Sequence, residues 1–246
     1  MEGITALKQN FKNILVYGCE TLENENEVLL SCLAKGYRDM TSARTTFKGI
    51  GEIFEEREKS FKKDKNNVNG EKTYRESFYK KLAEIITKKM LSKNFDNKDF
   101  FDKAHNETCN DIINLFHKEF SQLYVKPREF HYGSAQKLVN MTLKYFLLAA
   151  EDYKKEKENE VKTNSMYFNV LSNEPFLHCP IESIIINKMN EQREKSKGKI
   201  DSTWSTKKED EYLALQEEIQ KYVGDNESKL NYDFKVWKRK NLIDKD

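Results

Sequence analysis

The stretch Ser134–Tyr153, SAQKLVNMTLKYFLLAAEDY, is the most apolar part of this 246-residue chain, and it decides the fold. Its apolar residues recur with the spacing of a helix. We therefore predict a helix over 134–153 at the centre of the core. The longest unbroken apolar run within it, Tyr145–Ala150, is far too short to cross a bilayer, so we expect no membrane partner.

The composition as a whole also favours helices. The chain has only 3 Pro and 9 Gly, and all-β folds need many more of these residues for their turns. The hydrophobic fraction of 37% is low beside 34% charged residues, but 12% aromatics argue against disorder. We predict an all-α protein with a single irregular multi-helix domain over 1–246.

Helical periodicity extends outward from the central stretch on both sides. The other segments with this pattern are 25–35, 41–62, 73–93, 97–123 (expected as two helices) and the region from 202 to Gly224. Gly36 is a plausible C-cap for the first segment, and Gly49 and Gly51 are expected to interrupt the second.

Two polar segments, 62–72 and 154–165, are predicted to be surface insertions. The first contains Asn-Asn and Asn-Gly, which favour turns, and the second continues the central helix into a charged stretch. The C-terminal tail around Tyr232, Phe234 and Trp237 is aromatic enough to dock on the rest of the protein.

The cysteines and the N-terminus point to a reducing compartment. Cys19, Cys32, Cys109 and Cys179 lie far apart without a CxxC pair, so neither a disulfide scaffold nor a structural zinc site is expected. The N-terminus lacks a basic start followed by an apolar run. We expect a cytoplasmic protein without a metal or other cofactor.

Charge is distributed unevenly although the net charge is only +2. Residues 59–93 contain eleven Lys or Arg and four acids, whereas residues 94–120 contain three Lys and six acids. A basic block of this kind is typical of a phosphate-binding surface, with Lys62, Lys63, Lys80 and Lys81 as the predicted contacts. The alternative is that it forms the solvated face of a helix.

One segment has the residues for chemistry. The turn Gly133-Ser134-Ala135 opens directly into the apolar helix, where free backbone N–H groups would suit a phosphate. Lys137 follows in the first turn, and an amine placed there can act as a nucleophile. Forty residues later, the sequence LHCPIES (177–183) places Pro180 and Glu182 before another apolar helix.

This arrangement resembles the helix-hairpin-helix DNA glycosylases, through Gly133, Lys137 and Asn140, then Pro180, Ile181 and Glu182. The resemblance implies that Gly133, Ser134 and Gln136 bind the DNA backbone. It also implies that Lys137 attacks the sugar carbon of an extruded nucleotide while Glu182 stabilises the developing positive charge. The chain differs from the family in having Ala135 for the second hairpin glycine and Glu182 for an aspartate.

Other interpretations of these residues stay open. The turn and Pro180-Ile181-Glu182 can be ordinary helix starts, because a proline and an acid both suit a first turn. His178 and Cys179 form a candidate nucleophile pair, and His105, Cys109 and His117 have spacing that could hold a metal. The strings around Gln136-Lys137, LHCPI and Trp204-Ser205 also resemble a family of uncharacterised bacterial proteins, which implies no activity.

Two functions therefore emerge as hypotheses. The first is a protein that binds double-stranded DNA, with glycosylase or lyase activity at Lys137 and Glu182. The alternative is a non-enzymatic bacterial or phage protein that acts on a protein partner, which the richness in Lys, Asn and Glu suits.

Overall fold

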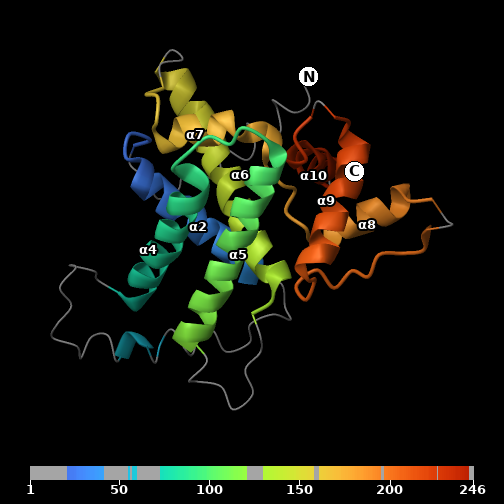
Figure 1. Cartoon of the computed structure of the whole chain (residues 1–246), viewed down its shortest axis with the longest axis horizontal. Coiled ribbons are helices and arrows are strands. Elements are labelled where there is room, and N and C mark those ends of the chain that lie inside the picture. Colours follow the sequence, from blue (N-terminus) through green and yellow to red (C-terminus); the bar gives the residue numbers. More distant parts are fainter. Residues whose placement is uncertain are drawn as a thin grey trace.

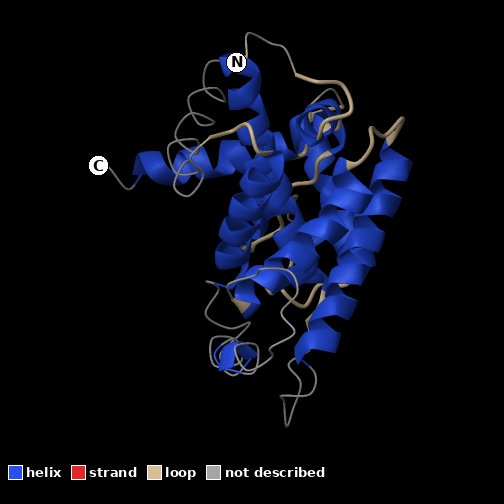
Figure 2. Ribbon diagram, turned by 90° about the vertical axis from the view of Figure 1, so that its left-hand side faces the viewer, coloured by secondary structure: helices blue, strands red, loops and turns tan. Residues whose placement is uncertain are grey.

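The computed structural model describes residues 21–41, 55, 57–59, 73–120, 130–157, 161–194, 197–225 and 227–243, with side chains described as far as Trp237. Within these ranges the chain forms helices and connecting loops, without a strand (Figure 2). The all-α prediction is confirmed for this part of the chain. None of its helices is long and apolar enough to span a bilayer.

In chain order the helices are α2 (Glu25–Thr41), α4 (Tyr74–Ile86), α5 (Lys98–Phe120), α6 (Tyr132–Glu156), α7 (Met166–Ser172), α8 (Ser183–Gln192), α9 (Glu209–Val223) and α10 (Leu230–Ile243). A π-helical turn, Thr87–Leu91, continues α4, and a short 3-10 helix, Glu174–Phe176, follows α7. Helices α2 and α5 pack on α6, and α4 packs on α2 and α5, while α8, α9 and α10 gather on the other side of α6 (Figure 1).

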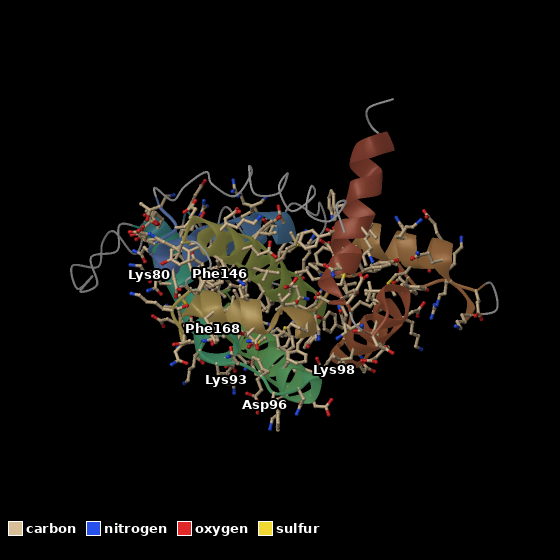
Figure 3. The ribbon with its side chains drawn as sticks, turned by 90° about the horizontal axis from the view of Figure 1, so that it is seen from above. Lys80, Lys93, Asp96, Lys98, Phe146 and Phe168 are labelled. Atoms are coloured by element: carbon tan, nitrogen blue, oxygen red, sulfur yellow. The ribbon has the colours of Figure 1, made fainter. Side chains whose placement is uncertain are left out.

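Helix α6 is the centre of the core, as predicted from its sequence. Every residue from Tyr132 to Ala150 is buried, and the Phe146 ring in its middle is 0% exposed (Figure 3). The helix extends to Glu156, so the predicted insertion at 154–165 begins with the last helical turn rather than with a loop. The lysines of that turn suit it, because cations interact favourably with the C-terminal end of the helix dipole.

The partner that lies closest along α6 is α2, and a glycine makes their approach possible. The prediction that Gly36 ends the first helix is wrong, because α2 continues through it to Thr41. A Cβ atom on Gly36 would lie 3.0 Å from Thr142 Oγ1 and 3.2 Å from the Thr142 backbone nitrogen. Gly36 is therefore a contact residue that allows two helix backbones to pack closely.

Replacing Gly36 by leucine should destabilise the protein by about 2 kcal/mol, because a bulky side chain has to force α2 away from α6. The measurement is the midpoint of urea unfolding. Arg38→Leu is the matched control, since Arg38 is exposed on the same helix and the added leucine contacts nothing there. Equal midpoints for the two variants would show that the close approach contributes nothing.

Helices α4 and α5 form the second layer of this half of the molecule. The predicted stripe on α4 is confirmed: Phe78, Leu82, Ile86 and Met90 are buried, and Ile85 packs at the edge. The expectation of two helices over 97–123 is wrong, because α5 is continuous from Lys98 to Phe120. No proline or glycine occurs in that stretch to interrupt it.

The C-terminal helices follow the sequence expectations more closely. Helix α9 ends at Gly224, which has a φ of +91°, a conformation that favours glycine. The aromatic tail docks as predicted, with Tyr232 and Phe234 buried. Lys144 of α6 forms a fully buried ion pair with Asp233 of α10, which ties the tail to the central helix.

Several predictions concern residues outside the described ranges. These are the interruption at Gly49 and Gly51, the insertion at 62–72, and the lysines Lys62 and Lys63.

Candidate functional site

The amine of Lys137 and the carboxylate of Glu182 lie together. Lys137 Nζ is 2.9 Å from Glu182 Oε2, although the two residues are 45 positions apart in the sequence. Their side chains are only 6% and 12% exposed. Because α6 begins at Tyr132, Lys137 lies in its second turn and not in the first turn as predicted. The pair joins this turn to the residue that precedes α8.

Each member of this pair also contacts a tryptophan. Lys137 Nζ lies 4.6 Å from the centroid of the Trp204 ring, a cation–π contact. The Trp237 indole donates a hydrogen bond of 3.1 Å to the other oxygen of Glu182. The ammonium and the carboxylate are thus both held by protein groups on more than one side.

The backbone N–H groups of the turn at Gly133 also bond to other groups of the protein. Its backbone N–H donates to Lys207 at 3.0 Å, and the N–H groups of Ser134 and Ala135 both donate to His131. A Cβ atom on Gly133 would lie 2.0 Å from the carbonyl oxygen of Trp204. Glycine is therefore required here by the close passage of the 204–205 backbone, and the N–H groups predicted to bind phosphate are bonded within the protein.

Gln136 explains why Glu182 reaches Lys137. Its side-chain amide donates to the carbonyl of Ile181 at 3.1 Å and accepts from the Ile181 N–H at 3.3 Å. The side-chain amide of Gln216 on α9 bonds Cys179 in the same way: it donates to the Cys179 carbonyl at 2.7 Å and accepts from the Cys179 N–H at 3.0 Å. Two glutamines from different helices thus hold the segment Leu177–Glu182 in place through hydrogen bonds to its backbone. Gln136 is 0% exposed and positions protein backbone, whereas the resemblance had assigned it to DNA.

A second polar cluster lies at His178. One ring nitrogen, Nε2, is 2.8 Å from Asp102 Oδ1, and the other, Nδ1, is 2.7 Å from the Tyr212 hydroxyl. Asn140 donates to the same hydroxyl at 2.9 Å and pairs with His105 Nε2 at 2.9 Å. These five residues, which we call the histidine network, connect α5, α6 and α9 with the segment Leu177–Glu182.

The electrostatics of the histidine network follow from its burial. Burial lowers the pKa of His178 to about 4, and burial together with the neighbouring His178 holds the pKa of His105 well below its usual value. Burial is the largest single influence on Asp102 and raises its pKa, but the hydrogen bond and charge of His178 together with the charges of Lys229 and Lys98 outweigh it and leave that pKa lowered. Both imidazoles are therefore neutral at pH 7.

The other candidate sites are not assembled. Cys179 directs its thiol to the carbonyl of Pro180 while His178 faces Asp102 and Tyr212, and burial raises the pKa of that thiol well above its usual value. His105 and Cys109 do lie together at 3.8 Å, but His117 is exposed further along α5. No group of three potential metal ligands occurs among the described residues.

Two lysines of the basic block pair with the acidic block. Lys81 of α4 lies 2.7 Å from Glu119 of α5. Lys89 of the π-helical turn lies 3.2 Å from Glu107 and 3.1 Å from Asp111, also of α5. Lys80 is 3.7 Å from Glu76 on its own helix. Of the four lysines predicted to contact phosphate, the two that the structure describes, Lys80 and Lys81, thus each have an acidic partner within the protein.

A groove between α2 and α4 is the feature that the sequence did not reveal. It has a volume of about 500 Å³, with Leu29, Leu30 and Ala83 as its apolar lining and Lys80, Glu84 and Lys88 among its polar residues. Lys80 marks its place at the end of the molecule away from α9 (Figure 3). In the sequence, the sign of this groove was the adjacent pair Leu29 and Leu30, because two neighbouring leucines make the apolar face of α2 wider than its contact with one helix would need.

Comparison of the chain with protein families, with curated proteins and with solved structures finds no match.

Removing one member of the Lys137–Glu182 pair should cost more than removing both. Lys137→Met leaves a nearly buried carboxylate without its ammonium, which should cost about 3 kcal/mol of unfolding free energy. The double variant Lys137→Met/Glu182→Leu should recover most of that loss, because no buried charge remains. Urea unfolding of the four proteins in this cycle gives the answer. Additive losses would show that the two groups do not interact.

Proposed function

We propose that this protein acts by binding a protein partner in the groove between α2 and α4. The observation that carries the proposal is the apolar lining of this groove, which has a volume of about 500 Å³ and lies between α2 and α4. A volume of this order suits a few apolar side chains. Grooves between helices commonly take one face of an amphipathic helix.

The charges beside the groove favour an acidic partner. Two lysines, Lys80 and Lys88, lie there with one acid, Glu84. Among the described residues no acid lies within ion-pair distance of Lys88, and Lys80 is 3.7 Å from Glu76. Carboxylates flanking the apolar residues of a bound helix would complement these ammonium groups.

A selection from a library of amphipathic helical peptides tests this proposal. Peptides enriched on the wild-type protein should have leucine-like residues spaced three or four apart and flanked by Asp or Glu. Leu30→Glu should weaken their binding at least about tenfold, because it puts a charge into the apolar lining. Lys88→Glu should shift the selected flanks from acidic to basic.

Lys93→Glu is the matched control, since it makes the same charge change outside the groove (Figure 3). It should leave the affinity and the selected flanks unchanged. Peptides that bind equally well to Leu30→Glu, or flanks that do not respond to Lys88→Glu, would place the binding elsewhere.

A second candidate function, a DNA lyase, is favoured by the contact between Lys137 and Glu182. In this proposal the Lys137 amine attacks C1′ of an abasic nucleotide, water leaves, and an imine joins the lysine to the sugar. Glu182 would stabilise the positive charge on that carbon. The attack requires Lys137 to leave both Glu182 and the Trp204 ring.

Borohydride trapping on abasic duplex DNA tests the lyase, because it reduces the imine to a stable protein–DNA adduct. The wild type should form the adduct and Lys137→Arg should not, since arginine keeps the positive charge but cannot form the imine. Lys144→Arg, which changes a buried lysine of the same helix, should still be trapped. A wild type that gives no adduct removes this candidate and leaves the peptide proposal untouched.

A further inference from the structure

We propose that acid opens the junction between the helical body and the C-terminal helices, with His178 and His105 as the groups that take up protons. The helical body here means α2 and α4–α6. The C-terminal part means the segment Leu177–Glu182 together with α8, α9 and α10. The histidine network lies on the boundary between them.

The position of the network makes it a junction. Asp102 and His105 belong to α5 and Asn140 to α6, whereas His178 and Tyr212 belong to the C-terminal part. The bonds from His178 to Asp102 and from Tyr212 to Asn140 both cross the boundary. The ring of Tyr212 also stacks on His105, with centroids 5.5 Å apart and planes at 8°.

The hydrogen bonds of the network can all be made by neutral imidazoles. Asn140 donates to the Tyr212 hydroxyl, and when His178 is neutral that hydroxyl can in turn donate to His178 Nδ1. His178 Nε2 then carries the hydrogen and donates to Asp102. A proton on Nδ1, 2.7 Å from the Tyr212 oxygen, would force the hydroxyl hydrogen to turn away and give up its acceptor inside the network.

The charges around the His178 and His105 rings do not compensate the positive charge that would result if both rings were protonated. The centroids of the His178 and His105 rings are 4.6 Å apart, so protonation of one opposes protonation of the other. Asp102 is the favourable neighbour of His178, but Lys98 and Lys229 act against its protonation. The charge of Asp102 also favours protonation of His105, but burial, the neighbouring His178 and Lys229 oppose it. His105 otherwise contacts Asn140, the Cys109 thiol and Tyr212.

The direction of the pH effect follows from the shifted pKa values. An unfolded or released histidine titrates near 6.5, whereas burial lowers the pKa of His178 to about 4 and that of His105 well below its usual value. Between these limits the released state binds more protons than the closed state. The stability of the junction is therefore complete above about pH 6.5 and falls as the pH drops toward 4.

The effect should be local because both buried histidines lie at the junction. The helical body keeps a core of aromatic contacts without a buried histidine: Phe78 packs on Phe116 and Phe120 with ring centroids 5.1 and 5.2 Å apart. Acid therefore weakens the contacts of the C-terminal part with the helical body first, while α2, α4 and α5 keep their apolar contacts.

The two tryptophans provide a reporter for the opening. Trp204 lies in the connection between α8 and α9, Trp237 lies on α10, and both pack against the Lys137–Glu182 pair at the boundary. Tryptophan fluorescence followed from pH 8 to pH 3.5 should show a transition between pH 6.5 and 4. Far-UV ellipticity should remain largely unchanged through the same transition, since the helices separate without melting.

Variants with one histidine replaced show which histidines take up the protons that cause the transition. His178→Gln and His105→Gln should each move the fluorescence midpoint down by about half a pH unit or more, because one proton-binding group is gone. His117→Gln, at an exposed position on α5, should leave it in place. These comparisons separate the histidines from Asp233, whose pKa is raised by burial and which is present in every variant.

Three results would overturn the proposal. The fluorescence transition could be absent above pH 4, it could coincide with the loss of ellipticity, or its midpoint could be the same in the wild type and both buried-histidine variants. If a variant unfolds at neutral pH, urea unfolding of the wild type at several pH values decides instead. A free energy of unfolding that does not fall between pH 6.5 and 4 contradicts uptake by His178 and His105.

Discussion

The placement of one extended segment, Leu177–Glu182, is the constraint on which the rest of the C-terminal structure depends. An extended backbone inside a helical protein has no strand beside it to satisfy its N–H and C=O groups, and leaving them unpaired is costly. Here the side-chain amides of Gln136 and Gln216 take the place of neighbouring strands, at Ile181 and Cys179 respectively. This register sends His178 toward α5 and Glu182 toward Lys137, so both polar clusters follow from it.

The same constraint explains why so many polar residues occur on a helix that is buried all round. Gln136, Lys137, Asn140 and Lys144 of α6 are each buried, and each has a partner in the C-terminal part. Apolar packing alone would let the C-terminal helices settle against α6 in several registers. Paired charges and amides penalise every arrangement but one, because a shifted partner leaves a buried polar group unsatisfied. The central helix thus supplies the core and also specifies how the C-terminal part docks on it.

Sequence reasoning succeeded where the signal was local. The apolar run of α6, the stripe on α4 and the glycine at the end of α9 all depend on residues near each other in the chain, and the structure has them as predicted. It failed at Gly36, whose role depends on a helix a hundred residues away. The contact of Lys137 with Glu182 was anticipated from a family resemblance, but the Trp204 and Trp237 contacts that enclose it were not. Asp102, Tyr212 and Gln216 carry no pattern in the sequence, because their significance comes only from what the fold brings beside them.

The close passage of the 204–205 backbone over Gly133 has a consequence for the interpretation of mutational scans. At this position even a methyl group collides with a carbonyl oxygen, so every substitution will score as damaging whatever the assay measures. A scan based on activity alone would then mark Gly133 beside Lys137 and Glu182 as an apparent catalytic signature. Only a scan that also records the amount of folded protein can distinguish a residue that the chemistry requires from one that the packing requires.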